Sequence, residues 1–231
     1  MSELFSIQLQ NRQQQGRDGV WLDLPTTTEQ VQAALRQIGI SSDNPQGLFI
    51  SGYFAEEGKR FAIPYNMVLA SNVDELNFLA ARLETLSAGG RAELNAALQA
   101  PQSELFSIGR ITDFPENVDY YMHLPDVRGP AQLGDYYLNR SGMVDMPEEW
   151  KSGIDTAQFG RYVAQQEQGV FTEYGYLVKS GDAWQKVHEG QPVPEEYRVL
   201  SFPAPEVLRD SANIPPPVQP ETEPQKVIPI I

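Results

Sequence analysis

Apolar and polar residues alternate in short runs at the start of the chain, which predicts strands followed by a helix. Apolar-rich runs at 4–9 and 20–24 flank a polar stretch ending in Asp18-Gly19, a pattern typical of a hairpin. A third run at 48–54 predicts another strand. Between them, helical spacing and a capping box at 26–29 predict a helix with one apolar face, formed by Val31, Ala34, Leu35 and Ile38. We expect an N-terminal α+β unit over residues 1–64, with a mixed sheet and a helix.

The pattern then changes to a helical period. Asn72 with Glu75 three residues later is typical of a helix start, and one apolar face follows it, formed by Leu76, Leu79, Ala80, Leu83 and Leu86. A second helical run over 92–98 ends before Pro101. The pattern predicts a small helical unit over residues 65–103.

Strand and helix patterns mix again after residue 103. Residues 117–125 and 169–178 are rich in aromatic and branched side chains, which favours strands. Helices are expected over 132–140, from Pro147, and after Asp155, whose partner for capping is Gln158. These elements predict an acidic α+β unit over residues 104–178, so the fold class is α+β with several small modules.

The last fifty residues differ from the rest of the chain. Two apolar runs around Pro192 and Pro194 predict an extra strand pair over residues 179–202. From residue 203 onward eight prolines follow, so residues 203–231 are expected to be a disordered, Pro-rich tail.

Charge narrows the possible partners. The chain carries 31 acidic and 17 basic residues, a net charge of −14. Residues 104–175 contain twelve acids and five bases. Their net charge of −7 is half of the net charge of the whole chain. Such a surface repels nucleic acid and attracts a basic protein groove, over a range of roughly 8 to 10 Å in physiological salt. Net acidity also keeps many proteins in solution, so composition alone leaves a simple solvated surface open.

Catalytic chemistry is scarce in the sequence. The chain has no cysteine and only two histidines, His123 and His188, which lack the spacing of metal ligands. No nucleotide-binding or hydrolase motif occurs, so we expect no cofactor and no enzyme activity. A metal-assisted hydrolase would need a carboxylate pair drawn from Asp113, Asp119 or the neighbours Glu148 and Glu149. Stabilisation of a helix start already explains the last two.

The location follows from what the sequence lacks. The N-terminus has no signal-peptide pattern, and no run approaches the roughly 18 to 20 apolar residues that span a bilayer. The absence of cysteine fits a reducing compartment. We expect a soluble cytoplasmic protein without membrane contact.

Several motifs together resemble the ArdA family of antirestriction proteins. The first two are Gly19-Val20-Trp21-Leu22-Asp23-Leu24-Pro25 and Leu76-Asn77-Phe78-Leu79-Ala80. The most specific set lies further on and comprises Leu133-Gly134-Asp135-Tyr136-Tyr137, Pro147-Glu148, Asp155, Phe159-Gly160-Arg161 and Gly169-Val170-Phe171-Thr172-Glu173-Tyr174-Gly175-Tyr176. Each motif alone is weak, but their order and spacing are specific, and together they cover residues from about 4 to 178.

The resemblance implies an elongated, non-catalytic homodimer, paired through its C-terminal part, that mimics duplex DNA. Such a protein occupies the basic DNA-binding groove of type I restriction-modification enzymes and does not bind nucleic acid itself. The side chains expected to replace phosphates are Asp113, Glu116, Asp119, Asp126, Asp135, Asp145, Glu148, Glu149, Glu167 and Glu173. Asp155 fits a helix cap as well as a contact. The alternative is an acidic module of a mobile element that binds another basic or DNA-binding protein, with the Pro-rich tail as a docking segment.

Overall fold

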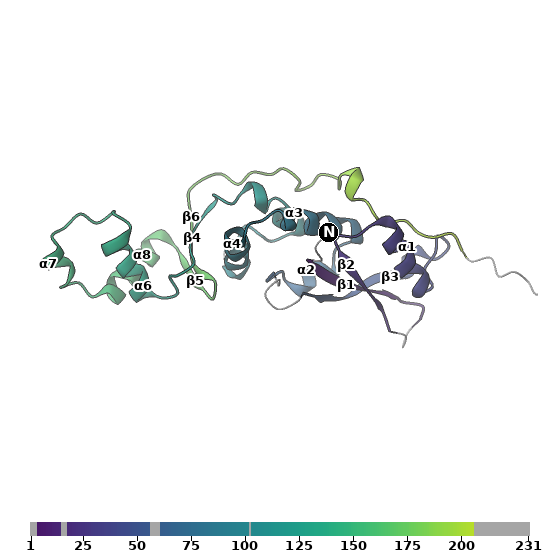
Figure 1. Cartoon of the computed structure of the whole chain (residues 1–231), viewed down its shortest axis with the longest axis horizontal. Coiled ribbons are helices and arrows are strands. Elements are labelled where there is room, and N and C mark those ends of the chain that lie inside the picture. The colour runs from purple at the N-terminus through teal and green to yellow at the C-terminus, as the bar shows by residue number, and fades with distance from the viewer. Residues whose placement is uncertain (1–3, 15–17, 56–60, 102, 206–231) are drawn as a thin grey trace, which may run out of the picture.

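The computed structural model describes residues 4–14, 18–55, 61–101 and 103–205 and shows an elongated molecule (Figure 1). Two three-stranded sheets lie apart along the long axis, with helices between them and beyond the second sheet. The fold class is α+β, as the sequence patterns predict. Every strand pairing in this part of the chain is antiparallel, so the expected mixed sheet in the first unit is wrong.

The first sheet and its helix follow the alternation of the sequence. Alternate residues Phe5, Ile7 and Leu9 are buried, so one face of the sheet turns to the core. The predicted pairing of the first two strands is confirmed, while residues 15–17 of their connection lie outside the described residues. The elements are β1 (Phe5–Asn11), β2 (Val20–Leu24), β3 (Leu48–Phe54), α1 (Thr28–Gln37) and the short η1 (Pro45–Gly47), with sheet order β2-β1-β3. The capping box of α1 forms between Thr27 and Gln30, one residue later than predicted.

Helices occupy the middle of the molecule, as expected. They are α2 (Tyr65–Leu69), α3 (Val73–Glu84), α4 (Ala88–Gln99), α5 (Ile108–Thr112) and η2 (Phe114–Glu116). The helix α3 begins at the predicted cap, where the Asn72 side chain accepts a hydrogen bond from the Glu75 amide and the Glu75 carboxylate accepts one from the Asn72 amide. This exchange satisfies two amides that a helix start otherwise leaves free.

The second sheet carries the distal helices, which form one end of the molecule (Figure 1). The elements are β4 (Tyr121–Leu124), α6 (Pro130–Asp135), the π-helical turn η3 (Tyr136–Arg140), α7 (Glu148–Lys151), α8 (Thr156–Glu167), β5 (Val170–Thr172) and β6 (Gly175–Lys179), with sheet order β4-β6-β5. The predicted cap of α8 is confirmed, because the Asp155 carboxylate accepts hydrogen bonds from the amides of Ala157 and Gln158.

Two glycines let α6 and α8 cross at backbone contact. A Cβ atom on Gly134 would lie 1.9 Å from the Thr156 carbonyl oxygen, and one on Gly160 would lie 1.8 Å from the Pro130 carbonyl oxygen. Any side chain at either position would therefore force the helices apart. The close crossing fixes the position of the distal helices relative to each other.

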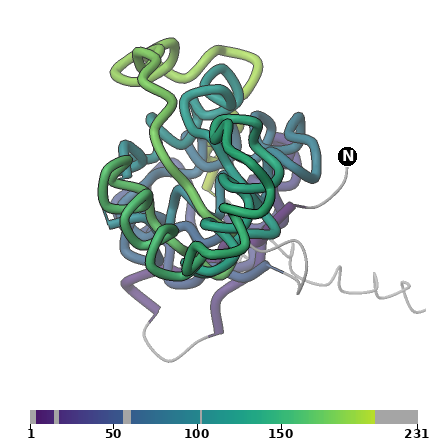
Figure 2. The backbone as a smooth tube through the Cα atoms, turned by 90° about the vertical axis from the view of Figure 1, so that its left-hand side faces the viewer, coloured from purple at the N-terminus to yellow at the C-terminus, as the bar shows by residue number. Residues whose placement is uncertain are grey.

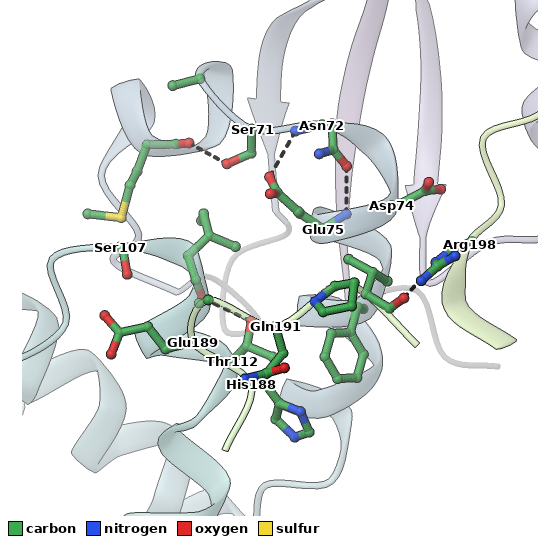
Figure 3. A pocket seen from close by; sticks show the side chains of 18 of the residues that line it. Ser71, Asn72, Asp74, Glu75, Ser107, Thr112, His188, Glu189, Gln191 and Arg198 are labelled. Atoms are coloured by element: carbon green, nitrogen blue, oxygen red, sulfur yellow. Dashed lines mark hydrogen bonds between the residues drawn. The ribbon is translucent and has the colours of Figure 1, made fainter. Parts of the chain in front are cut away.

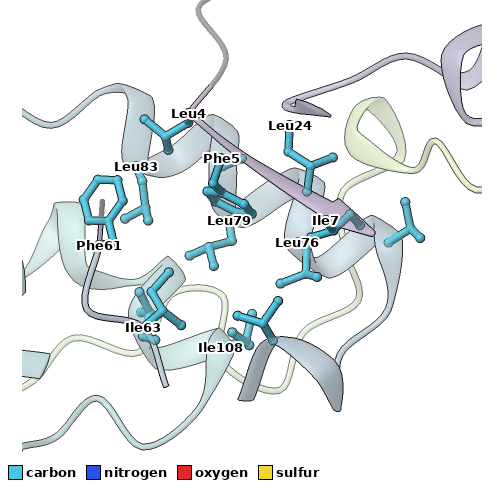
Figure 4. Packing of buried hydrophobic residues seen from close by; sticks show 14 of the residues in the cluster. Leu4, Phe5, Ile7, Leu24, Phe61, Ile63, Leu76, Leu79, Leu83 and Ile108 are labelled. Atoms are coloured by element: carbon cyan, nitrogen blue, oxygen red, sulfur yellow. The ribbon is translucent and has the colours of Figure 1, made fainter. Parts of the chain in front are cut away.

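The apolar residues form two clusters. The larger one joins the first sheet to α3 and α5, with Phe5, Leu76, Leu79 and Ile108 in its centre (Figure 4). It crosses the predicted boundaries at 64 and 103. The smaller cluster lies within the acidic unit and contains Val127, Leu133, Tyr137, Ala164, Tyr176 and Val178. The division of the chain into the predicted units stays a prediction.

The predicted strand pair over residues 179–202 is wrong. After β6 ends at Lys179, residues 180–205, here called the return segment, run back along the helices towards α1 (Figures 1 and 2). The return segment forms no strand and contains only the short turn η4 (Glu195–Tyr197). Its amides pair with side chains of the helical region instead of with a neighbouring strand, and Pro192 and Pro194 have no amide hydrogen to pair. Residues 206–231 of the predicted tail lie outside the described residues.

Candidate partner-binding surface

Five of the predicted acids lie at the distal end of the molecule. They come from the turn after β4, from α6, and from α7 with the loop before it. The set, here called the distal acidic surface, consists of Asp126, Asp135, Asp145, Glu148 and Glu149. Asp135 is half-buried and the other four are exposed. Carboxylates at this end of the molecule are therefore accessible to a partner.

Only two of these five carboxylates have a cationic neighbour in the described chain. Asp135 lies 3.4 Å from the Arg140 guanidinium, and Glu148 lies 3.3 Å from the Lys151 ammonium. Such exposed pairs contribute roughly 0 to 1 kcal/mol each, so a competing cation can replace them. Within the described residues, the carboxylates of Asp126, Asp145 and Glu149 form neither an ion pair nor a hydrogen bond. These three carboxylates are available to the cations of a partner, while Arg128 and Arg161 add exposed positive charge at the same end.

Asp113 does not belong to any surface, which corrects its prediction as a phosphate surrogate. Its side chain is fully buried. One carboxylate oxygen accepts a hydrogen bond of 2.6 Å from the His188 amide and the other accepts one of 3.2 Å from the Glu189 amide. A partner cannot reach this carboxylate, and it cannot form a surface pair with Asp119 for hydrolysis.

Three other predicted acids already have partners inside the protein. Glu116 forms an ion pair with Arg82, and Glu173 accepts a hydrogen bond from Gln99. Glu167 accepts hydrogen bonds from the hydroxyls of Tyr137 and Tyr176, which belong to the smaller core. Burial, with help from the hydrogen bond to Glu167, raises the pKa of both tyrosine hydroxyls. We interpret Glu167 as part of the fold of the distal end.

Asp119 is exposed and faces a carboxylate that the sequence did not single out. Burial, together with the negative charge of Asp119, raises the pKa of Glu93 on α4 to about 8. At neutral pH Glu93 is therefore mostly uncharged, and only Asp119 of the two contributes to the surface potential. The two residues line a groove of about 350 Å³.

Long-range ion pairs were also missed. Arg110 is buried and binds Glu104 at 3.1 Å and Glu189 at 3.0 Å, while Glu104 also accepts a hydrogen bond of 2.8 Å from Lys179. The hydrogen bond from Lys179 and the two cationic charges hold the pKa of Glu104 below its usual range despite its burial. These charges cancel inside the protein. Their separation in sequence, up to 79 positions, leaves no local signal for the pairing.

The return segment contains exposed acids that lie outside the acidic region of residues 104–175. Asp182, Glu195 and Glu196 are exposed. Their charge was visible in the sequence, but the predicted strand pair gave no reason to place them beside the helical region. They add negative charge away from the distal end, although Lys186 and Arg198 of the same segment are also exposed.

Both histidines make contacts within the protein. The His123 ring nitrogen lies 2.9 Å from the Tyr174 carbonyl oxygen, and the His188 ring packs edge-on against Phe78 at 4.9 Å. Within residues 4–14, 18–55, 61–101 and 103–205, no group of three or more histidine, cysteine or acidic side chains is arranged to hold a metal ion. In the same residues, no helix combines the length and apolarity that crossing a membrane requires.

Comparisons with known proteins agree with the sequence motifs. The family model described as Antirestriction protein (ArdA) matches residues 15–178, well over half of the chain. The search of curated proteins found no match to the chain. The match begins after β1, covers the other two strands of the first sheet, the second sheet and the distal helices, and ends one residue before the end of β6. The chain belongs to the ArdA family of antirestriction proteins, which act against restriction-modification systems.

Proposed function

We propose that this protein acts in the cytoplasm as a non-catalytic mimic of duplex DNA that occupies the DNA-binding groove of a type I restriction-modification enzyme. Carboxylates stand in for phosphates and pair with lysine and arginine side chains of the groove. Family membership, the elongated shape and the excess of acids support this proposal. Incoming DNA is then excluded because the groove is already filled.

The observation that carries the proposal is the distal acidic surface on ordered elements. Asp135 lies on α6, Glu148 and Glu149 lie in the first turn of α7, and the glycine contact joins α6 to α8. Groups that are already fixed lose little conformational entropy on binding. A fixed set of carboxylates therefore binds a basic groove better than the same charges on a flexible tail would.

The proposed contact residues differ from the sequence prediction at several positions. Asp113 is removed because it is buried, and Glu116 and Glu167 are secondary because the fold already uses them. Glu173 is kept because it is exposed despite its hydrogen bond with Gln99. The proposed phosphate surrogates are Asp119, Asp126, Asp135, Asp145, Glu148, Glu149 and Glu173.

Charge neutralisation at matched positions tests the proposal. The distal variant combines Asp126→Asn, Asp145→Asn, Glu148→Gln and Glu149→Gln. The control variant neutralises four exposed acids of the first unit, with Asp18→Asn, Asp23→Asn, Glu29→Gln and Asp43→Asn. Both variants change the net charge by the same amount, so a nonspecific charge effect would be equal in the two.

Cleavage and methylation by a purified type I enzyme are measured with each protein at increasing salt. We expect inhibition by the wild type to weaken as salt rises, because binding of this kind releases ions. We expect the distal variant to lose at least tenfold more potency than the control. Equal losses in the two variants, or inhibition that does not change with salt, would refute the assignment of this surface. Recovery of a different basic protein from cells would support the alternative partner.

We also propose that the protein is a homodimer through its distal end. Met143, Trp150 and Tyr162, from α7, α8 and the loop before α7, are 74%, 70% and 60% exposed. Exposed apolar side chains that gather in one patch mark protein contacts, and we propose that these three form such a patch. Sedimentation at micromolar concentration should show a dimer for the wild type and a monomer for Trp150→Ser with Tyr162→Ser. The control Trp21→Ser with Phe54→Ser removes two exposed aromatics of the first sheet and should stay dimeric.

A further inference from the structure

The return segment is attached to the rest of the protein by side chains that bind its backbone. Near its start, the buried Asn117 makes two hydrogen bonds with Gln185. Its amide nitrogen donates to the Gln185 carbonyl oxygen at 3.0 Å, and its side-chain oxygen accepts from the Gln185 amide at 2.7 Å. Asn117 thus replaces the partner strand that a strand pair would have supplied.

The second attachment is the buried carboxylate of Asp113, which holds the amides of His188 and Glu189. No cation pairs with this carboxylate among the described residues. The Glu189 side chain in turn accepts a hydrogen bond of 3.0 Å from the buried Arg110. Release of the segment would leave a buried carboxylate and a buried guanidinium without these partners, which is unfavourable.

The third attachment lies on α3, more than 30 positions earlier in the chain. One carboxylate oxygen of Asp74 accepts hydrogen bonds from the amides of Val199 and Leu200 at 2.8 and 2.7 Å. Asn77 donates to the Tyr197 carbonyl oxygen at 3.1 Å and accepts from the Thr26 amide at 2.7 Å. The side chain of Asn77 therefore links the return segment directly to the first unit.

The segment ends on the first unit itself. The Ser42 amide donates to the Pro203 carbonyl oxygen at 2.9 Å, and the Gln32 side chain donates to the Ser201 hydroxyl at 3.2 Å. Between these ends, the Phe78 ring packs against His188 at 4.9 Å and Tyr197 at 4.8 Å. The segment is thus bound along most of its length.

Between the second and third attachments the segment bridges a groove of about 1070 Å³. The groove lies between the start of α3, which carries Asn72 and Asp74, and the region around Ser107 and Thr112 (Figure 3). His188 and Gln191 of the return segment line the same groove. A segment fixed on both sides of a groove limits the change in its width, because widening would break hydrogen bonds at one end.

From these contacts we propose that the return segment is a brace that, in addition to the larger apolar cluster, holds the first unit and the acidic unit in one fixed relative position. Asp74, Asp113 and Asn117 are its positioning residues, and they act on backbone amides of the brace without touching a partner. The family match ends at residue 178, so the brace lies outside the matched region. It deepens the proposed function, which rests on carboxylates held in a fixed arrangement.

The test uses the full chain and does not need a restriction enzyme. The brace variant is Asp74→Ala with Asn117→Ala, and the control is Asp43→Ala with Asn66→Ala, which changes the same residue types at exposed positions. The chain has no cysteine, so Gln37→Cys on α1 and Gln166→Cys on α8 give two unique spin-label positions at the two ends. Electron-spin distance measurements then report how the ends are arranged.

We expect a narrow distance distribution for the wild type and the control, and a clearly broader one for the brace variant. Amide exchange at Gln185, Val199 and Leu200 should become at least tenfold faster in the brace variant, with unchanged helix content by circular dichroism. Faster exchange with an unchanged narrow distribution would show that the segment binds without bracing. Unchanged exchange would show that Asp74 and Asn117 do not hold it. If the brace variant loses helix content, the single variant Asp74→Ala provides the comparison at Val199 and Leu200, because both amides lose their acceptor while Asn117 stays in place.

Failure of this test and failure of DNA mimicry are separate outcomes. A broadened distribution with unchanged inhibition of a restriction enzyme confirms the brace and contradicts the need for a fixed shape. A narrow distribution in every variant rejects the brace whether or not the protein inhibits the enzyme.

Discussion

Replacement of Glu93 by glutamine should make the protein more stable at alkaline pH and leave its stability nearly unchanged at pH 5. One carboxylate oxygen of Glu93 is buried and has no hydrogen-bond partner in the described residues. Burial and the nearby Asp119 raise the pKa of Glu93 from its usual 4.5 to about 8. In the unfolded chain the carboxyl ionises near its usual pKa, so the unfolded state loses its proton first as pH rises.

The sign of the effect follows from this difference in proton binding. Between pH 4.5 and about 8 the folded protein holds one more proton than the unfolded chain, so the free energy of unfolding falls as pH rises. At about 1.4 kcal/mol for each unit of pKa, the upper bound is about 5 kcal/mol. Because the side chain is only partly buried, solvent screening reduces this to about 1 to 2 kcal/mol. Glu93→Gln removes this penalty, since its amide carries no charge at either pH.

The assay is thermal unfolding of the wild type and Glu93→Gln at pH 5 and pH 8.5. For a chain of this size, about 1 to 2 kcal/mol corresponds to an increase of about 2 to 8 °C in Tm at pH 8.5. The control Glu29→Gln should have the opposite sign, because hydrogen bonds with the backbone and with Thr27 lower the pKa of the exposed Glu29. Its carboxylate stabilises the folded state above the usual pKa, and that contribution is lost as pH falls. The reasoning is refuted if Glu93→Gln changes Tm equally at both pH values.

Three further predictions concern the distal end. Gly134→Ala should destabilise it by about 1 to 3 kcal/mol, because the new methyl group meets the backbone of α8. The control Gly129→Ala should be neutral, because no atom lies within 4 Å of the added carbon, and hydrogen exchange of α6 and α8 checks both variants. Glu167→Gln should lower the free energy of unfolding by about 1 to 3 kcal/mol in chemical denaturation, because the new amide nitrogen cannot accept a hydrogen bond from a tyrosine hydroxyl. Tyr176→Phe should lower it less. Equal stability of Glu167→Gln and the wild type would contradict the structural role of this acid. Asp145→Asn alone should reduce inhibition of the restriction enzyme less than about fivefold, because the proposed contacts are distributed and one exposed pair contributes roughly 0 to 1 kcal/mol. Complete loss of inhibition in a folded variant would contradict a distributed surface.

Local signals in the sequence predicted the local structure well. The caps at Asn72 and Asp155 are confirmed, and so is the alternation that pairs the first two strands. Each of these features depends on residues a few positions apart, or on a period of two along one strand. The order of the family motifs also predicted the α+β class and the antirestriction family.

Long-range partners explain what the sequence could not show. The sequence around Asp113 is typical of a surface acid, but its carboxylate binds amides 75 and 76 positions later in the chain. The return segment contains strand-forming residues such as Val199, yet the acceptor for the Val199 amide is Asp74, 125 positions earlier. The choice between a paired strand and a bound extended segment depends on the neighbouring surface, which periodicity does not encode.

The most direct test of DNA mimicry is competition between this protein and duplex DNA for one restriction enzyme. A fluorescently labelled target duplex is bound to a purified type I enzyme, and its anisotropy is followed as the protein is added at several salt concentrations. We predict complete displacement of the duplex, an affinity that falls steeply with salt, and a shallower salt dependence for the distal variant. A ternary complex in which the enzyme holds both the duplex and the protein would contradict the account.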